Sequence, residues 1–213
     1  MKKLLVAAFF VLCAIPLAAQ TQAERAYIEG NDFGFSFYTG FVLYEPMDYN
    51  MTRSFGINLI YHPVSVIAIE PAFFFTRIEQ DEESNISGSV DSDRSTVAGG
   101  SIGVFLYNHL GGNLYLYVGP RASYMNEDVT SYNNENSSRT ERKGDYWGIS
   151  AVFGMKFMFN DHFAVFGDFG FGYLQHEYDY RYFNSSGTKT TDRTTKEKFF
   201  TAASAILGVT FYL

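Results

Sequence analysis

Period-two alternation of apolar residues with small or polar residues is the feature that most constrains this chain. In residues 147–159 every odd position is apolar, whereas the even positions include Gly148, Ser150, Gly154 and Lys156. Successive side chains of a β-strand point to opposite faces, so this pattern predicts a strand with one apolar face and one small or polar face. Similar segments recur along the chain and are separated by turn-rich stretches, which indicates an all-β fold.

The large apolar residues are predicted to face outward. Phe33, Phe35 and Phe37 share one face of the first such segment, opposite Gly34 and Ser36. On the opposite faces of these segments, the residues are too small and too often charged to form an apolar core. A closed sheet with an apolar exterior requires lipid around it, so the pattern favours a transmembrane β-barrel.

We expect an eight-stranded, antiparallel, up-and-down barrel. Its strands are predicted at residues 32–44, 53–62, 65–79, 94–107, 113–126, 147–159, 163–178 and 198–213. Pro71 lies within the third strand and cannot donate a ladder hydrogen bond, so we expect a bulge or gap there. In the fourth strand we place Ile102 and Val104 outward, which turns Phe105 and Tyr107 inward.

The connections between these strands alternate in length. Three are short, near residues 62–64, 108–112 and 160–162. The others are longer and polar, at residues 45–52, 80–93, 127–145 and 179–197. Outer-membrane barrels have short periplasmic turns and long outer loops. An even number of strands leaves the N-terminus and the C-terminus of the barrel on the periplasmic side.

The first 19 residues are predicted to be a cleaved signal peptide, which leaves a single barrel domain at residues 20–213. Lys2 and Lys3 precede an apolar run that ends in small residues. Cys13, the only cysteine, lies in that run, so the mature domain is expected to have no disulfide. Removal of the two lysines changes the formal charge from −7 to −9, which argues against binding to nucleic acid.

The mature chain resembles the small eight-stranded outer-membrane proteins of the OmpA-barrel and OmpX-like group. The resemblance rests on the strand pattern and on the last strand, where Gly208, Phe211 and Leu213 match the spacing of the family's C-terminal assembly signal. Leu213 stands where a terminal phenylalanine is usual. The resemblance implies location in the bacterial outer membrane and recognition by the barrel-assembly machinery.

Four charged residues are predicted to lie inside the barrel at membrane depth: Glu70, Arg121, Lys156 and Asp168. The interior of an eight-stranded barrel is just wide enough for side chains to fill, and unpaired charge there is costly. Strands six and seven form a tight hairpin, so we expect Lys156 to lie diagonally near Asp168. The four residues would either plug the lumen through ion pairs or form a gate whose pairs exchange.

Aromatic residues near the strand ends are candidates for the membrane-interface girdles. This set contains Tyr38, Tyr44, Tyr61, Tyr115, Tyr117, Trp147, Tyr173 and Tyr212. The expected partners of the barrel surface are outer-membrane lipid and lipopolysaccharide. Loops 80–93, 127–145 and 179–197 are the predicted contacts for a further surface partner.

The leading functional prediction is a non-enzymatic protein with an envelope-structural or surface-interaction role of the adhesion type. A narrow channel for small solutes or ions, gated by charges such as Lys156 and Arg121, is the first alternative. An outer-membrane enzyme that depends on His176 is the second. A secreted soluble barrel that binds a small apolar ligand is the third, and it would require the phenylalanine-rich faces to point inward. No cofactor or metal site is predicted, because the histidines show no paired spacing.

Overall fold

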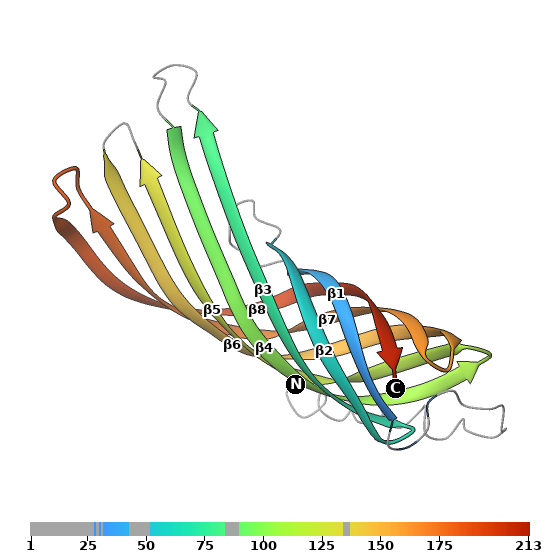
Figure 1. Cartoon of the computed structure of the whole chain (residues 1–213). Coiled ribbons are helices and arrows are strands. Elements are labelled where there is room, and N and C mark those ends of the chain that lie inside the picture. Colours follow the sequence, from blue (N-terminus) through green and yellow to red (C-terminus); the bar gives the residue numbers. More distant parts are fainter. Residues whose placement is uncertain (1–27, 29, 31, 43–51, 84–89, 134–136) are drawn as a thin grey trace.

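The chain forms one closed, antiparallel β-barrel in a computed structural model that describes residues 28, 30, 32–42, 52–83, 90–133 and 137–213 (Figure 1). The strands are β1 (Asp32–Val42), β2 (Thr52–Val64), β3 (Ile67–Glu83), β4 (Val90–Gly111), β5 (Leu114–Asn133), β6 (Ser138–Asn160), β7 (Phe163–Phe183) and β8 (Lys189–Tyr212). Each strand pairs with its sequence neighbours, and β8 returns to pair with β1. The predicted eight-stranded up-and-down barrel is therefore confirmed. The described residues include no helix with the length and apolar character needed to cross a membrane.

The three connections at one end of the barrel are tight turns, at residues 65–66, 112–113 and 161–162. In the β4–β5 turn, Gly111 and Gly112 have φ values of +114° and +57°. These values lie in a region that is open to glycine and strained for other residues. The short connections that the sequence predicts are therefore present at this end, which is the periplasmic end in outer-membrane barrels.

At membrane depth, large apolar side chains face outward and the predicted interior charges face inward, as predicted. Phe55, Phe73 and Ile149 are 71%, 64% and 56% exposed, whereas Lys156 is only 2% exposed. A soluble barrel would show the opposite distribution. The alternative of a secreted barrel with phenylalanines inside is therefore contradicted by this arrangement.

The phase of β4 is also as predicted. Ile102 and Val104 are about half exposed, and Phe105 and Tyr107 are buried inside the lumen. At Pro71 the β2–β3 ladder has a gap, since the pairing passes from Asn58↔Ala72 directly to Tyr61↔Ile69. On its other side Pro71 stays in register with Ile102, so the expected irregularity is a gap in one ladder only.

The long outer connections are largely strand, which corrects the sequence-based loop boundaries. The β5–β6 ladder continues to Asn133↔Ser138 and the β7–β8 ladder continues almost to its turn, at Phe183↔Lys189. The β3–β4 ladder likewise extends to Glu83↔Val90. Three hairpins therefore rise well past the short β1–β2 hairpin (Figure 1). The connection predicted at residues 45–52 lies mostly outside the described residues.

An arginine at the centre of the lipid-facing surface should destabilise the inserted barrel. Phe153 is the middle outward position of the apolar stretch of β6 and is 41% exposed. We expect Phe153→Arg to destabilise the folded state by about 2–4 kcal/mol, the cost of an arginine at the bilayer midplane. Denaturant titration of protein refolded in phosphatidylcholine vesicles measures this. The control Thr191→Arg, on the exposed outer part of β8, should change the unfolding free energy by less than about 0.5 kcal/mol.

Candidate functional site

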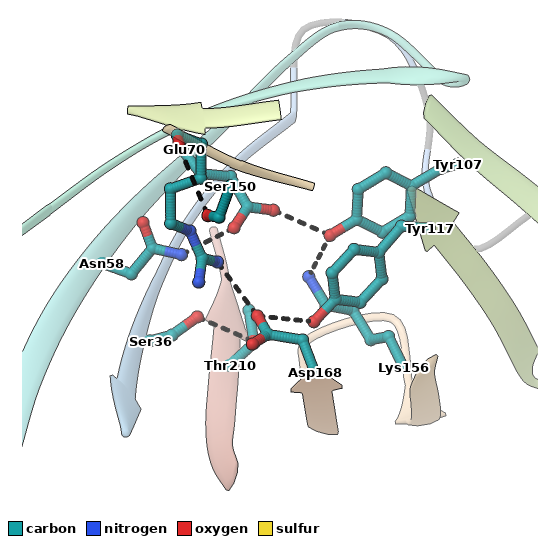
Figure 2. Close-up of polar contacts among 10 residues, drawn as sticks. Ser36, Asn58, Glu70, Tyr107, Tyr117, Ser150, Lys156, Asp168 and Thr210 are labelled. Carbon is teal, nitrogen blue, oxygen red and sulfur yellow. Dashed lines mark hydrogen bonds and ion pairs between the residues drawn. The ribbon is translucent and has the colours of Figure 1, made fainter. Parts of the chain in front are cut away.

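A buried ion pair joins two strands across the lumen. The Arg121 guanidinium on β5 donates from Nη2 to Asp168 Oδ2 on β7 at 2.9 Å. The Tyr117 hydroxyl donates to the same carboxylate oxygen at 3.4 Å (Figure 2). The side chains of Arg121 and Asp168 are 12% and 1% exposed, so this charge pair is removed from bulk solvent.

A second group of polar contacts centres on Glu70 of β3. Its carboxylate accepts from Asn58 Nδ2 at 2.7 Å and from the Tyr107 hydroxyl at 2.8 Å (Figure 2). Lys156 Nζ donates to the Tyr107 oxygen at 2.9 Å and to the Tyr212 oxygen at 2.9 Å. The tyrosine hydroxyl thus links the lysine cation to the glutamate.

The structure brings the four predicted interior charges into one region. Lys156 lies diagonally across the β6–β7 ladder from Asp168, as predicted, because Lys156 pairs with Phe166 and Gly154 pairs with Asp168. Among the described residues, Lys156 makes no ion pair with Asp168, whose cationic partner is Arg121. Lys156 Nζ instead lies 5.0 Å and 5.3 Å from the ring centroids of Tyr107 and Tyr212. The two tyrosine hydroxyls accept from the ammonium group, and together with the nearby rings they supply part of the stabilisation that a carboxylate would supply.

Four of the predicted girdle aromatics lie in the lumen, which corrects their assignment. Tyr38, Tyr115, Tyr117 and Tyr212 are each 9% exposed or less. Two of them cover glycines on the neighbouring strand: Tyr38 is paired with Gly56 and Tyr117 with Gly154, and a Cβ on either glycine would overlap the tyrosine ring. In this narrow interior, each tyrosine ring therefore occupies the space that the facing glycine leaves free.

The other predicted girdle residues keep their outward position where the structure describes them. Trp147 is 50% exposed and its ring contacts Tyr173, with centroids 6.0 Å apart. Tyr61 stacks on Phe33 at 4.6 Å. Tyr44 lies outside the described residues. Their role at the membrane interface stays a prediction.

The predicted C-terminal signal residues lie on the β8 side of the closing ladder. Phe211 pairs with Phe35 and stacks on its ring at 5.4 Å. Leu213 is 84% exposed, and Gly208 pairs with Phe166 of β7. Recognition of these residues by the assembly machinery stays a prediction.

A second polar cluster, which the sequence reasoning missed apart from His176, lies nearer the long hairpins. Glu127 accepts from Arg142 and from the Tyr146 hydroxyl, both at 3.1 Å. His176 stacks on Tyr146 with centroids 3.7 Å apart, and its Nε2 lies 3.8 Å from Glu127. The outward neighbour Asp145 is polar and exposed, so this cluster lies beyond the apolar belt that ends at Trp147.

Stability should fall as acid protonates His176. Burial, and then the charge of Arg142, lower the pKa of His176 to about 4. The unfolded state therefore binds more protons than the folded state between about pH 4 and pH 6.5, and stability is lost as the pH falls through that window. The loss attributable to His176 should be on the order of 1–2 kcal/mol, since the site is near the surface. His176→Phe keeps the stacking and should flatten the pH profile of unfolding in this window. An unchanged profile would contradict the assignment.

The acidic residues nearest in sequence to His176, the residue on which the enzyme alternative depends, have partners of their own. Glu177, next to His176 in sequence, forms an ion pair with Lys196 at 2.8 Å on the exposed surface. Asp179 accepts from the Thr194 hydroxyl at 2.7 Å. Within the described ranges, no group of three histidine, cysteine, aspartate or glutamate residues has a geometry that could hold a metal ion.

Comparison with known proteins agrees with the architecture. The model of the outer membrane protein beta-barrel domain family matches residues 5–211. OprG from Pseudomonas aeruginosa is similar in fold, with a TM-score of 0.57 and 11% identity over 87% of this chain and 97% of its own. A major outer membrane protein from Thermus thermophilus gives 0.54 and 10%, over 85% and 99%. No curated protein sequence matches this chain. The chain thus belongs to the outer membrane protein beta-barrel family and is a protein of the outer membrane.

Proposed function

We propose that this protein is a surface-interaction protein, in which a sealed barrel anchors a projecting sheet that contacts a partner outside the cell. The observation that carries the proposal is the length of the outer strands. β7 and β8 have 21 and 24 residues, whereas a tilted strand needs about 9–11 to cross the membrane. Ladder hydrogen bonds continue through this extra length, so it forms a stiff sheet.

The chemistry of the projecting sheet suits a polar partner. Its side chains form ion pairs of both signs, such as Lys143–Asp128 at 2.9 Å and Lys196–Glu177 at 2.8 Å. Arg139 also lies over the rings of Tyr132 and Phe183, at 5.3 Å and 5.9 Å. Arginine and tyrosine are enriched where proteins bind other macromolecules, so this end of the β5–β6 hairpin is the best candidate contact.

The lumen does not favour the channel alternative. The centre of the lumen is filled by charged residues that contact one another or neighbouring tyrosines: Glu70, Arg121, Lys156 and Asp168. Opening a path would separate buried charge pairs, which costs several kcal/mol. We therefore expect no steady conductance above background in a planar lipid bilayer.

The test is adherence of bacteria that display the full chain. Cells are compared on arrays of immobilised glycans and extracellular proteins, at increasing sodium chloride concentration. The comparison variant replaces residues 128–143 by a short turn, and a second, Arg139→Ala, removes the stacked cation together with its ion pair to Glu141. Both should lower retention several-fold, and salt should weaken the binding of the full chain.

Slower migration on a denaturing gel after boiling verifies that each displayed barrel is folded. Equal retention of full-length and shortened proteins would contradict the surface-interaction proposal. A steady conductance from the refolded full chain would favour the channel instead.

A further inference from the structure

A cavity of about 140 Å³ lies in the lumen, on the long-hairpin side of the buried ion pair. Arg121 and Asn58 border it toward the ionic network, and Glu127 and Tyr146 of the outer polar cluster border it at the other end. It is therefore a compartment between two polar layers. Neither the ion pair nor the projecting sheet accounts for it.

Apolar and aromatic side chains form most of the cavity wall. Phe74, Met125, Phe166, Leu174 and Ile206 line it from four different strands. An apolar cavity of about 150 Å³ is large enough to bind benzene. The volume and the lining therefore fit one aromatic ring.

One polar group at the cavity lacks a partner. Asn58 is 4% exposed, and its Nδ2 donates to Glu70 at 2.7 Å. This donation fixes the orientation of the amide, so Oδ1 is the remaining acceptor. Within the described part of the chain, Asn58 Oδ1 has no hydrogen-bond partner. A buried acceptor without a donor is costly. Oδ1 is enclosed by its neighbours, so a donor on a bound molecule would satisfy it once the Asn58 side chain, which lines the cavity, turns toward that cavity.

We propose that this cavity binds a single-ring aromatic molecule that carries one hydroxyl group, a ligand of the phenol class. The ring lies among the apolar side chains, and the Asn58 amide turns toward the cavity so that the hydroxyl donates to Oδ1. A pocket built from apolar walls and a few placed polar groups is the usual form of a small-molecule site. This proposal stands independently of the surface-interaction role.

The test uses p-cresol (4-methylphenol) as the probe and toluene as the analogue without a hydroxyl. The full chain, refolded in lipid nanodiscs, is titrated with each and followed by amide NMR. We expect saturable shifts around Ser101 and Ser150, which line the cavity. Binding of p-cresol should be roughly three- to tenfold tighter than binding of toluene, the effect of one hydrogen bond.

Two variants of β5 provide a matched comparison. Ser123→Phe places a ring in the cavity, and Ala122→Phe places the same ring on the exposed outer face of the same strand. Saturable p-cresol binding should be lost in the first and kept in the second. If Ser123→Phe does not fold, Ser101→Phe fills the cavity from β4. Shifts that only grow linearly in the native protein, or equal binding in the filled variant, would overturn the site. Equal affinity for p-cresol and toluene would overturn the phenol class.

Discussion

Asp168→Leu is expected to destabilise the folded barrel by about 3–5 kcal/mol, because it leaves Arg121 as a buried cation without its carboxylate. The substitution also removes the acceptor of the Tyr117 hydroxyl. Guanidinium titration of protein refolded in phosphatidylcholine vesicles, followed by tryptophan fluorescence, measures the change in unfolding free energy.

The double variant Arg121→Met/Asp168→Leu separates charge from packing. Replacing both members of a buried pair by apolar groups is often nearly neutral, so the double variant should recover most of the lost stability. If the double variant instead loses as much stability as Arg121→Met and Asp168→Leu lose when made singly and summed, the pair does not act as a unit. A loss below about 1 kcal/mol for Asp168→Leu would likewise contradict the assigned burial of the pair.

Lys156→Met is expected to destabilise the folded barrel by a similar amount, about 3–5 kcal/mol, because it leaves Glu70 as a buried anion without its cation. Without the lysine, Glu70 keeps its two hydrogen-bond donors but has no cation connected to it through Tyr107. The same titration measures the change. Lys156→Met/Glu70→Gln removes both charges and should restore most of the stability. No recovery would mean that Lys156 acts by packing against the tyrosine rings alone.

The sequence predicts which residues are interior but not how they pair. Strand alternation alone places Glu70, Arg121, Lys156 and Asp168 on inward faces. Their partners depend on how far neighbouring strands slide past each other, which sets what lies across the lumen. Lys156 bonds to Tyr107, 49 positions away in sequence, and local spacing gives no signal for such a contact.

The tyrosine assignments failed for a related reason. Tyr38 follows Phe37 in sequence, so the alternation that turns Phe37 outward turns Tyr38 inward. Residue type favoured the membrane interface, but strand phase and the facing glycine Gly56 decided the position. Phase is therefore the stronger guide in a strand of known face.

Hydrophobic periodicity could not predict the projecting parts of the strands. In 127–145, both faces meet water, so neither needs to be apolar and the period-two signal disappears. Those strands are held by ladder bonds and by cross-strand pairs such as Lys143–Asp128. Polar strands of this kind resemble loops when only composition is read.

The β1–β8 ladder differs from the other seven in that no turn connects its two strands. It runs only from Gly34↔Tyr212 to Val42↔Ser204, with a buried hydroxyl contact between Ser36 and Thr210 at 2.8 Å. Loop-closure entropy is therefore largest for this ladder, because its strands lie at opposite ends of the barrel sequence. We expect the β1–β8 ladder to form last during insertion. A steady pulling force on the two chain ends should separate β1 from β8 before any other pair of strands.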